Sequence, residues 1–315
     1  MELDLIIATC NRVALLKRAL ESVARAIRPD DLKLKVTVVD NNSSDSTRDT
    51  VFALQKTLDL DLTYIFERKR GKSFALNTGV AATHGTHVGM IDDDEEIGCE
   101  WFVHCVKAFS NAQVDFIGGP YLPRWGAQRP DWLPMVYKGV IGWVEVAEKP
   151  AVFDSNFSGM LMGGNCVITR DILAKAGPYS TVLNRTEKLL LAGEDEDMYH
   201  RLLAIGARGV YLPELIIHHF IPPERLTKRY FKRWCFWRGV SLGLMDRERP
   251  INAVYFAGVP RFFFGRAGRA LARIAKRAAM VRGDRPDEAF TDFLSIVDLA
   301  GFAYGKHFYR TAKQL

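Results

Sequence analysis

Five acidic residues follow a short apolar run in the segment GMIDDDEEIG, at positions 89–98. Carboxylates this close repel one another unless they are solvated or share a cation. At the end of an extended strand, residues i and i+2 point to the same side. Asp92 and Asp94 are therefore placed to hold a hard divalent cation such as Mg²⁺ or Mn²⁺, with a solvated acidic turn as the alternative. We favour the metal site because an apolar strand precedes the acids and polar residues end the neighbouring predicted strands.

Two further segments could bind a nucleotide. Asp40 ends the apolar run VTVVD, where an aspartate is commonly a turn former or a helix cap. At a nucleotide site the same side chain could accept a hydrogen bond from a base N–H. The segment ERKRGKS brings Arg70 and Lys72 to the start of a predicted helix, where basic side chains and backbone N–H groups together make an anion site. An ordinary solvated basic loop is equally compatible with this segment.

Acids and histidines near the end of the regular pattern add candidates for proton transfer and metal binding. The segment GEDED places Glu194, Asp195 and Asp197 in the first turn of a predicted helix. Acids there stabilise the helix dipole, and one of them could also act as a general base toward a hydroxyl. His219 ends the last predicted strand, and its imidazole could complete a set of metal ligands or lie in an ordinary structural environment.

Strands alternate with helices from the first residue. Apolar runs predict buried strands at 3–8, 35–40, 62–66 and 86–91, each followed by a helical pattern. This alternation predicts a doubly wound α/β sheet with right-handed crossovers, whose ligands bind at the carboxyl ends of the strands. The polar groups at 9–12, 40–42 and 92–94 follow three of these strands, so we expect them to converge on one site.

The composition is that of a globular protein in a reducing compartment. The chain has 315 residues, of which 48% are hydrophobic and 25% charged, and a formal net charge of +6. Its five cysteines are widely spaced and form no CxxC pair, which argues against a disulfide framework or a structural zinc site. The sequence shows no secretory signal and no apolar stretch of about 18 residues that could span a membrane. We expect a cytoplasmic protein.

Basic residues concentrate toward the C-terminus, in ERLTKRYFKRWCFWRG and RFFFGRAGRALARIAKRAAMVRGDR. We therefore divide the chain into a domain at 1–225 and a helical, basic C-terminal region at 226–315. Mixed basic and aromatic residues suit a membrane interface, and residues 230–282 could lie on an anionic membrane surface. That would place the protein on the inner face of the plasma membrane. The alternative is a helical subdomain that packs on the domain at 1–225; we expect no nucleic acid partner.

Taken in order, seven stretches resemble the family 2 glycosyltransferases of the GT-A fold and span roughly residues 3–227. They are IIATCNR, VVDNNSSDST, RGKSFALNTGVA, GMIDDDE, GGNCVITRDILAKAGPY, GEDEDMYHRLLAIG and YLPELIIHHFIPPERLT. The resemblance implies a GT-A type, Rossmann-like doubly wound sheet with a helical, basic C-terminal extension. It implies an enzyme that moves a sugar, with inversion, from a nucleoside-diphosphate sugar to an acceptor hydroxyl. We expect UDP as the nucleotide, and as the acceptor a saccharide or lipid-linked saccharide in the synthesis of a surface polysaccharide.

The resemblance also implies roles for individual residues. The catalytic base is Asp195, and Glu194 and Asp197 lie on the acceptor side. The implied metal ligands are Asp92, Asp94 and His219. Because Asp93 lies between the two aspartates, which two of the three contact the metal stays open. The implied nucleotide and donor contacts are Thr9, Asn11, Arg12, Asp40, Arg70, Lys72, Asn77, Asp92 and Asp93.

Two other functions compete with this interpretation. One is a phosphotransferase that uses the acidic cluster, but such an enzyme should carry its nucleophilic aspartate after the first strand, and IIATCNR has none there. The other is a non-catalytic module that binds a nucleotide or a cation, which should lose nothing when Asp195 is replaced.

Overall fold

The computed structural model describes residues 1–111, 113–181, 193–248, 250–280 and 286–309. The chain divides into two compact units, which are described separately below. Unit 1 comprises Met1–Arg124, Trp143–Asn184 and Glu194–Phe220, and unit 2 comprises Trp125–Gly142, Arg185–Gly193 and Ile221–Leu315. The division between residues 225 and 226 that the sequence suggests stays a prediction.

Unit 1 is built on a mixed eight-stranded sheet with the order β3-β2-β1-β4-β9-β6-β10-β8. Its strands are β1 (Glu2–Thr9), β2 (Lys33–Asp40), β3 (Leu62–Phe66), β4 (His87–Asp92), β6 (Phe116–Gly118), β8 (Ala151–Phe153), β9 (Asn165–Thr169) and β10 (Gly209–Tyr211). The first four are mutually parallel, as predicted, whereas β9 runs antiparallel to both β4 and β6. Because β9 begins where β4 ends, with Asn165 opposite Ile91, the residues that lead into β9 lie at the carboxyl edge of β4.

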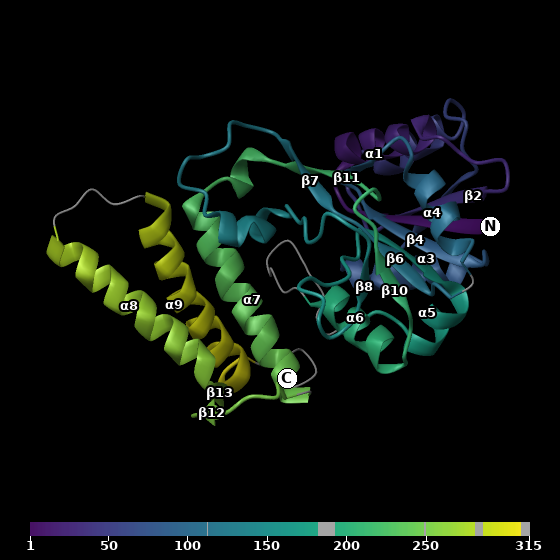
Figure 1. Cartoon of the computed structure of the whole chain (residues 1–315). Coiled ribbons are helices and arrows are strands. Elements are labelled where there is room, and N and C mark those ends of the chain that lie inside the picture. Colours follow the sequence, from purple (N-terminus) through teal and green to yellow (C-terminus); the bar gives the residue numbers. More distant parts are fainter. Residues whose placement is uncertain (112, 182–192, 249, 281–285, 310–315) are drawn as a thin grey trace. The chain divides into compact units, whose positions relative to one another are not determined.

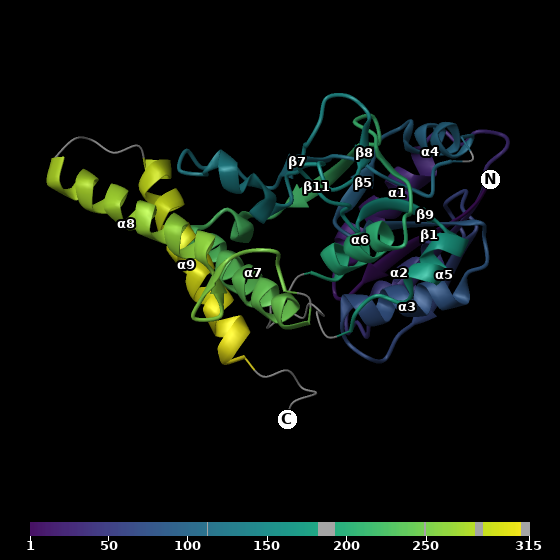
Figure 2. The same ribbon diagram turned by 60° about the horizontal axis from the view of Figure 1, so that its bottom comes forward.

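Helices cover both faces of this sheet (Figures 1 and 2). They are α1 (Val13–Arg25), α2 (Thr47–Leu54), α3 (Lys72–Ala82), α4 (Trp101–Phe109), α5 (Arg170–Ala176) and α6 (Glu194–Ala204). Leu5 and Ile7 pack with α1, α2 and α4 in one apolar cluster, whereas Ile6 packs with α3, α5 and α6 in the other. Alternate side chains of β1 thus enter different cores, which is why its sequence is a continuous apolar run rather than an alternating one.

A small second sheet has the order β5-β11-β7. Its strands are β5 (Glu95–Ile97), β7 (Tyr121–Trp125) and β11 (Ile217–Ile221). β5 follows β4 after a two-residue turn and pairs antiparallel with β11, so that His219 lies opposite Glu95. This pairing brings a histidine from late in the chain to the acidic run.

Unit 2 is mainly helical. Its elements are η1 (Met135–Ile141), η2 (Pro223–Arg225), α7 (Lys228–Glu248), β12 (Tyr255–Phe256), β13 (Val259–Pro260), α8 (Arg261–Met280) and α9 (Pro286–His307). Helix α9 lies between α7 and α8 and contacts both (Figure 1). The strands β12 and β13 form a hairpin directly before α8.

Glycines allow α7 and α9 to meet backbone to backbone. They are spaced four residues apart on each helix, at Gly239 and Gly243 on α7 and at Gly301 and Gly305 on α9. A Cβ atom at Gly301 would lie 2.1 Å from the carbonyl oxygen of Phe236, closer than any real contact. The two helices therefore pack at a distance that no larger residue permits at these positions.

The α/β fold with a helical C-terminal part is confirmed. None of the five cysteines, all of which the structure describes, takes part in a disulfide. In the part of the chain that the structure describes, every helix is too short or too polar to span a bilayer.

Candidate active site

Three strand ends lie level at one edge of the large sheet. The register pairs Thr9 of β1 with Asp40 of β2, and Ala8 of β1 with Asp92 of β4. The loops that leave β1, β2 and β4 therefore start side by side, as the sequence predicts. Every site residue described below belongs to unit 1.

The loops after β1 and β2 are held together by hydrogen bonds. Asn11, with a positive φ of 55°, donates its backbone N–H to Ser43 Oγ (2.9 Å), and its side-chain oxygen accepts from the N–H of Ser44 (2.7 Å). The buried Asp40 accepts from the N–H of Ser43 (2.9 Å) and from the hydroxyl of Tyr64 (2.8 Å). Burial, with the Asp40 carboxylate beside it, raises the pKa of Tyr64 to about 12. Asp40 thus shapes its turn, and each of its oxygens keeps a lone pair for a further donor.

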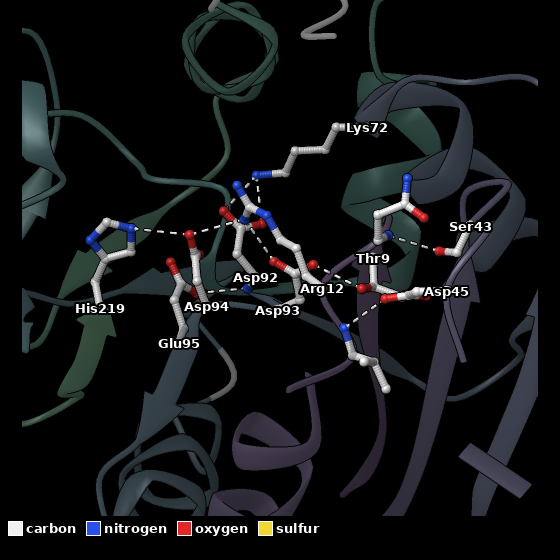
Figure 3. Close-up of polar contacts among 12 residues, drawn as sticks. Thr9, Arg12, Ser43, Asp45, Lys72, Asp92, Asp93, Asp94, Glu95 and His219 are labelled. Atoms are coloured by element: carbon white, nitrogen blue, oxygen red, sulfur yellow. Dashed lines mark hydrogen bonds and ion pairs between the residues drawn. The ribbon is translucent and has the colours of Figure 1, made fainter. Parts of the chain in front are cut away.

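Arg12 joins the first loop to the acidic run. Its Nη1 lies 3.0 Å from Asp93 Oδ1 and 3.1 Å from Asp94 Oδ2, and Asp93 also accepts from the Thr9 hydroxyl at 2.8 Å (Figure 3). Burial, only partly countered by Arg12, raises the pKa of Asp93 to about 6. Burial acts against the charge of Arg12, but the two aspartates outweigh it and raise the pKa of Arg12 above its ordinary value.

Lys72, at the start of α3, approaches the acidic run from another side (Figure 3). Its Nζ lies 2.6 Å from Asp92 Oδ1 and 2.9 Å from Asp92 Oδ2. Burial disfavours the ammonium, but Asp92, Asp195 and the buried Glu194 outweigh it and raise the pKa of Lys72 well above its ordinary value. Lys72 therefore remains charged and is electrostatically linked to both acidic segments. Arg70 instead donates to a backbone carbonyl of the loop after β2, at 3.1 Å.

Glu95 and His219 complete the acidic cluster. His219 Nε2 lies 3.6 Å from Asp94 Oδ2, a position set by the pairing of β11 with β5 (Figure 3). Glu95 is 1% exposed, and its Oε2 accepts the backbone N–H of Asp92 at 2.7 Å. Its Oε1 is buried and has no hydrogen-bond partner among the described residues. Burial and the charges of Asp92 and Asp94 raise the pKa of Glu95 well above its ordinary value.

This arrangement fits a hard divalent cation. One carboxylate oxygen each from Asp92, Asp94 and Glu95 lies within 4.8 Å of the others. The four acids at 92–95 face the two cations Lys72 and Arg12, which leaves two negative charges unbalanced when all are ionised. Oxygen ligands and a deficit of two positive charges suit Mg²⁺ or Mn²⁺, and the partnerless Glu95 oxygen supplies a free donor.

Two consecutive glycines lie against two of the carboxylates. A Cβ atom at Gly163 would lie 2.0 Å from Asp195 Oδ1, and one at Gly164 would lie 2.5 Å from Glu95 Oε1. Asp195 is in the first turn of α6, whereas Glu95 begins β5. The turn into β9 thus touches both acids, and only glycines leave them this room.

Two predicted site residues make structural contacts. The Asn77 amide bonds the backbone of Tyr179 in both directions, accepting its N–H at 2.8 Å and donating to its carbonyl at 3.0 Å. Asp197 pairs with Arg201 one helical turn later, at 2.9 Å. These bonds fix α3 and α6 locally, and the donor and acceptor roles expected of the two residues stay predictions.

Sequence reasoning missed two residues of the cluster. Glu95 was overlooked as a ligand because the i, i+2 rule for strands selects Asp92 and Asp94, whereas the chain turns at residues 93 and 94. Tyr121 lies on β7 with its ring 6.4 Å from that of His219, and its buried hydroxyl has no partner in the described part of the chain. No sequence signal marked Tyr121, because it lies in the irregular segment between regular elements.

Comparison with known proteins identifies related chains. Residues 4–175 match the model of glycosyl transferase family 2. The succinoglycan biosynthesis protein ExoM of Rhizobium meliloti is 23% identical over 261 residues, which cover 79% of this chain and 76% of ExoM. A glucosyl-dolichyl phosphate glucuronosyltransferase of Haloferax volcanii is 25% identical over 260 residues, 79% of each chain.

A solved structure shares the fold. The mannosyltransferase PcManGT of Pyrobaculum calidifontis, in complex with GDP-Man and Mn²⁺, aligns over 98% of this chain and 88% of its own. The TM-score is 0.63 and the sequence identity 18%. At this identity the likeness establishes the fold, and the expected GT-A architecture is confirmed.

Proposed function

The chain belongs to glycosyltransferase family 2 and is a glycosyltransferase, and from this premise we propose that it is a metal-dependent, inverting enzyme that uses a nucleoside-diphosphate sugar. The observation that carries the proposal is the carboxylate cluster of Asp92, Asp94 and Glu95, whose partnerless buried oxygen lies at the carboxyl edge of the sheet. A stable protein keeps such a cluster when a bound cation balances it. The family assignment argues against both competing interpretations, the non-catalytic module and the phosphotransferase.

Asp92, Asp94 and Glu95 would hold the cation, with His219 beside Asp94. Bound there, Mg²⁺ or Mn²⁺ would supply Lewis-acid stabilisation to the departing diphosphate. Lys72 and Arg12 place two fixed positive charges at the same edge, where they help to bind the phosphates.

Asp195 acts in the proposal as the general base. Its carboxylate lies against Gly163, and the next residue, Gly164, lies against Glu95. The two acids therefore border the same glycine turn. The acceptor oxygen attacks the anomeric carbon while the bond from that carbon to the diphosphate oxygen breaks. The acceptor proton passes to Asp195, and a single displacement inverts the anomeric configuration. Glu194 and Asp197 belong to the same helical turn and stay on the acceptor side of the proposal.

The nucleotide binds, in our proposal, over the ends of β1 and β2. Thr9, Asn11 and Arg12 form one wall, and Asp40 accepts a base N–H with a lone pair that its internal bonds leave available. Arg70 borders the same loops. We favour UDP because the family resemblance suggests it, and a donor screen decides between UDP and GDP.

We propose a lipid-linked saccharide as the acceptor and the assembly of a surface polysaccharide as the setting. Two relatives support this choice by their names, one in succinoglycan biosynthesis and one acting on a dolichyl phosphate-linked sugar. Such acceptors are confined to membranes. The enzyme would then work in the cytoplasm, at the inner face of the plasma membrane.

The test is a donor screen on the full chain. Each UDP- and GDP-sugar is incubated with Mn²⁺ or with a chelator, and release of nucleoside diphosphate is followed with and without a panel of lipid-linked acceptors. We expect one donor to turn over only with metal, and Asp94→Asn to abolish that turnover. Asp171→Asn serves as a matched control because Asp171 is an exposed acid on α5. Undiminished turnover in chelator, or in Asp94→Asn, would contradict the metal assignment.

A further inference from the structure

Helix α8 is attached to unit 2 through one side. Phe263, Ala267 and Ala270 are at most 4% exposed and recur at helical spacing, and the ring of Phe263 packs on Phe302 of α9 at 4.7 Å. The helix sequence RFFFGRAGRALARIAKRAAM contains six basic residues and no acidic residue. Most of the other residues that the structure describes on this helix are exposed, and they include both basic and apolar side chains.

An apolar strip runs along this open surface. Phe264 and Leu271 are seven residues apart, two helical turns, and are 36% and 56% exposed. Phe256, on the neighbouring hairpin, is 65% exposed and contacts Phe264 with ring centroids 5.5 Å apart. We call Phe256, Phe264 and Leu271 the apolar strip. Three large exposed apolar side chains in line are uncommon on a surface that faces only water.

A row of cations runs beside the strip. Arg269 and Lys276 are also seven residues apart, and both are exposed. Neither forms an ion pair with any residue of the described chain, whereas Arg273, between them, pairs with Asp292. Between the strip and the row, the helix presents the small exposed residues Gly268 and Ala272. The backbone of α8 can therefore approach a flat surface closely.

The geometry points to an anionic membrane as the partner: we propose that α8 lies in the headgroup plane, with the apolar strip inserted and Arg269 and Lys276 paired to lipid phosphates. Cations alone would fit any polyanion, but cations flanking exposed phenylalanine and leucine fit a surface that is anionic outside and apolar beneath. Within the predicted range 230–282, α7 contributes little, because its aromatic residues pack inside unit 2 against residues such as Tyr304 and Tyr309.

This proposal rests on the proposed function in one respect: membrane binding would bring the enzyme to a lipid-linked acceptor. Its test is flotation of the full chain with vesicles of phosphatidylcholine alone or with about one third phosphatidylglycerol, at low and high salt. We expect binding to the anionic vesicles and loss of binding at high salt or without phosphatidylglycerol. Each basic residue near an anionic surface raises the partition coefficient of the protein onto vesicles roughly fivefold, so Arg269→Glu with Lys276→Glu should lower that coefficient by at least about 25-fold.

Matched control variants distinguish a specific effect of the exposed α8 surface on vesicle binding from a general effect of net charge or hydrophobicity. Lys56→Glu with Lys107→Glu makes the same charge change at two exposed lysines of unit 1, and Ile205→Ser matches Leu271→Ser at an exposed residue of similar size. The control variants should bind vesicles like the unmodified protein, and Leu271→Ser should bind more weakly.

Three results would overturn the proposal: no binding to anionic vesicles, binding that the α8 variants retain, or equal loss in the control variants. Binding to a soluble polyanion such as heparin, without binding to vesicles, would indicate a different partner for this surface. That result would also overturn the membrane proposal. Donor turnover is measured on the same preparations. Failure of flotation with intact turnover rejects the membrane face alone, and the reverse pattern rejects the proposed function alone.

Discussion

Replacing Glu95 by glutamine should stabilise the protein in the absence of a divalent cation and weaken its response to one. One Glu95 oxygen lies within 4.8 Å of oxygens from Asp92 and Asp94. At an effective dielectric constant of about 20, two unit charges at that distance repel by about 3 kcal/mol. At pH 7 the buried Glu95 carboxyl can destabilise the folded state by at most about 3 kcal/mol. Protonating a group with an ordinary pKa of 4.5 at this pH costs about that much, and the folded protein would take up a proton rather than bear a larger cost. Since Lys72 offsets part of the repulsion, we expect a gain of about 1–3 kcal/mol in chelator.

The response to metal should change in the opposite direction. At roughly 100 times the dissociation constant, Mn²⁺ adds about 2.7 kcal/mol to the unmodified protein. Loss of one anionic ligand should weaken binding by at least 10- to 100-fold, which leaves about 0.4–1.4 kcal/mol at the same concentration. At about 2 °C per kcal/mol, the Mn²⁺-induced rise in melting temperature should fall from about 5 °C to about 1–3 °C.

Thermal unfolding at pH 7, with chelator and with Mn²⁺, measures both effects. Glu96→Gln is the matched control, because the adjacent Glu96 pairs with Arg18 at 2.5 Å and with Arg124 rather than with the cluster. That variant should keep the full rise with Mn²⁺. The reasoning is refuted if Glu95→Gln is less stable than the unmodified protein in chelator, or if it keeps the full rise.

Three further predictions concern the glycine turn, pH and unit 2. Gly164→Ala places a methyl group 2.5 Å from Glu95 Oε1 and displaces that ligand, so the Mn²⁺-induced rise in melting temperature should fall as it does in Glu95→Gln; an unchanged rise would contradict the close contact. Because the folded pKa of Asp93 is about 6 against 3.8, the folded state holds this proton more tightly, and the unfolding free energy should fall by about 2 kcal/mol between pH 4 and 6. Urea titrations of Asp93→Asn should lack that slope. Gly301→Ala forces α7 from α9 at Phe236 and should lower the melting temperature by several degrees without altering the Mn²⁺ response; equal stability would contradict the packing.

The parallel half of the sheet could be predicted because its local signals agree. The continuous apolar runs of β1, β2 and β4 each end in polar residues, and parallel strands bring those ends to one edge. The convergence of Thr9, Asp40 and Asp92 follows from these two facts alone and is what the register shows. Their individual roles in binding stay predictions.

The remaining geometry depends on contacts between distant segments, which no local pattern encodes. His219 reaches Asp94 through the pairing of β11 with β5, and Gly164 reaches Glu95 because β9 runs antiparallel to β4. In unit 2, the segment Trp125–Gly142 joins the C-terminal helices through Trp132, whose ring lies 5.4 Å from that of Phe231. The irregular sequence around Trp132 gives no period from which this packing could be inferred.

The most direct test of the central claim is transfer of sugar from a nucleoside-diphosphate sugar, followed by NMR with Mn²⁺ or chelator in the unmodified protein, Asp195→Asn and Asp197→Asn. We predict metal-dependent transfer with inversion at the anomeric carbon. In Asp195→Asn the rate should fall by about 10²–10⁴-fold, with unchanged Mn²⁺-dependent binding of the nucleotide. Asp197→Asn should lower the rate much less, because Asp197 is paired with Arg201 and does not take up the acceptor proton in this proposal. Transfer in chelator, retention of configuration, or full activity in Asp195→Asn would contradict the account.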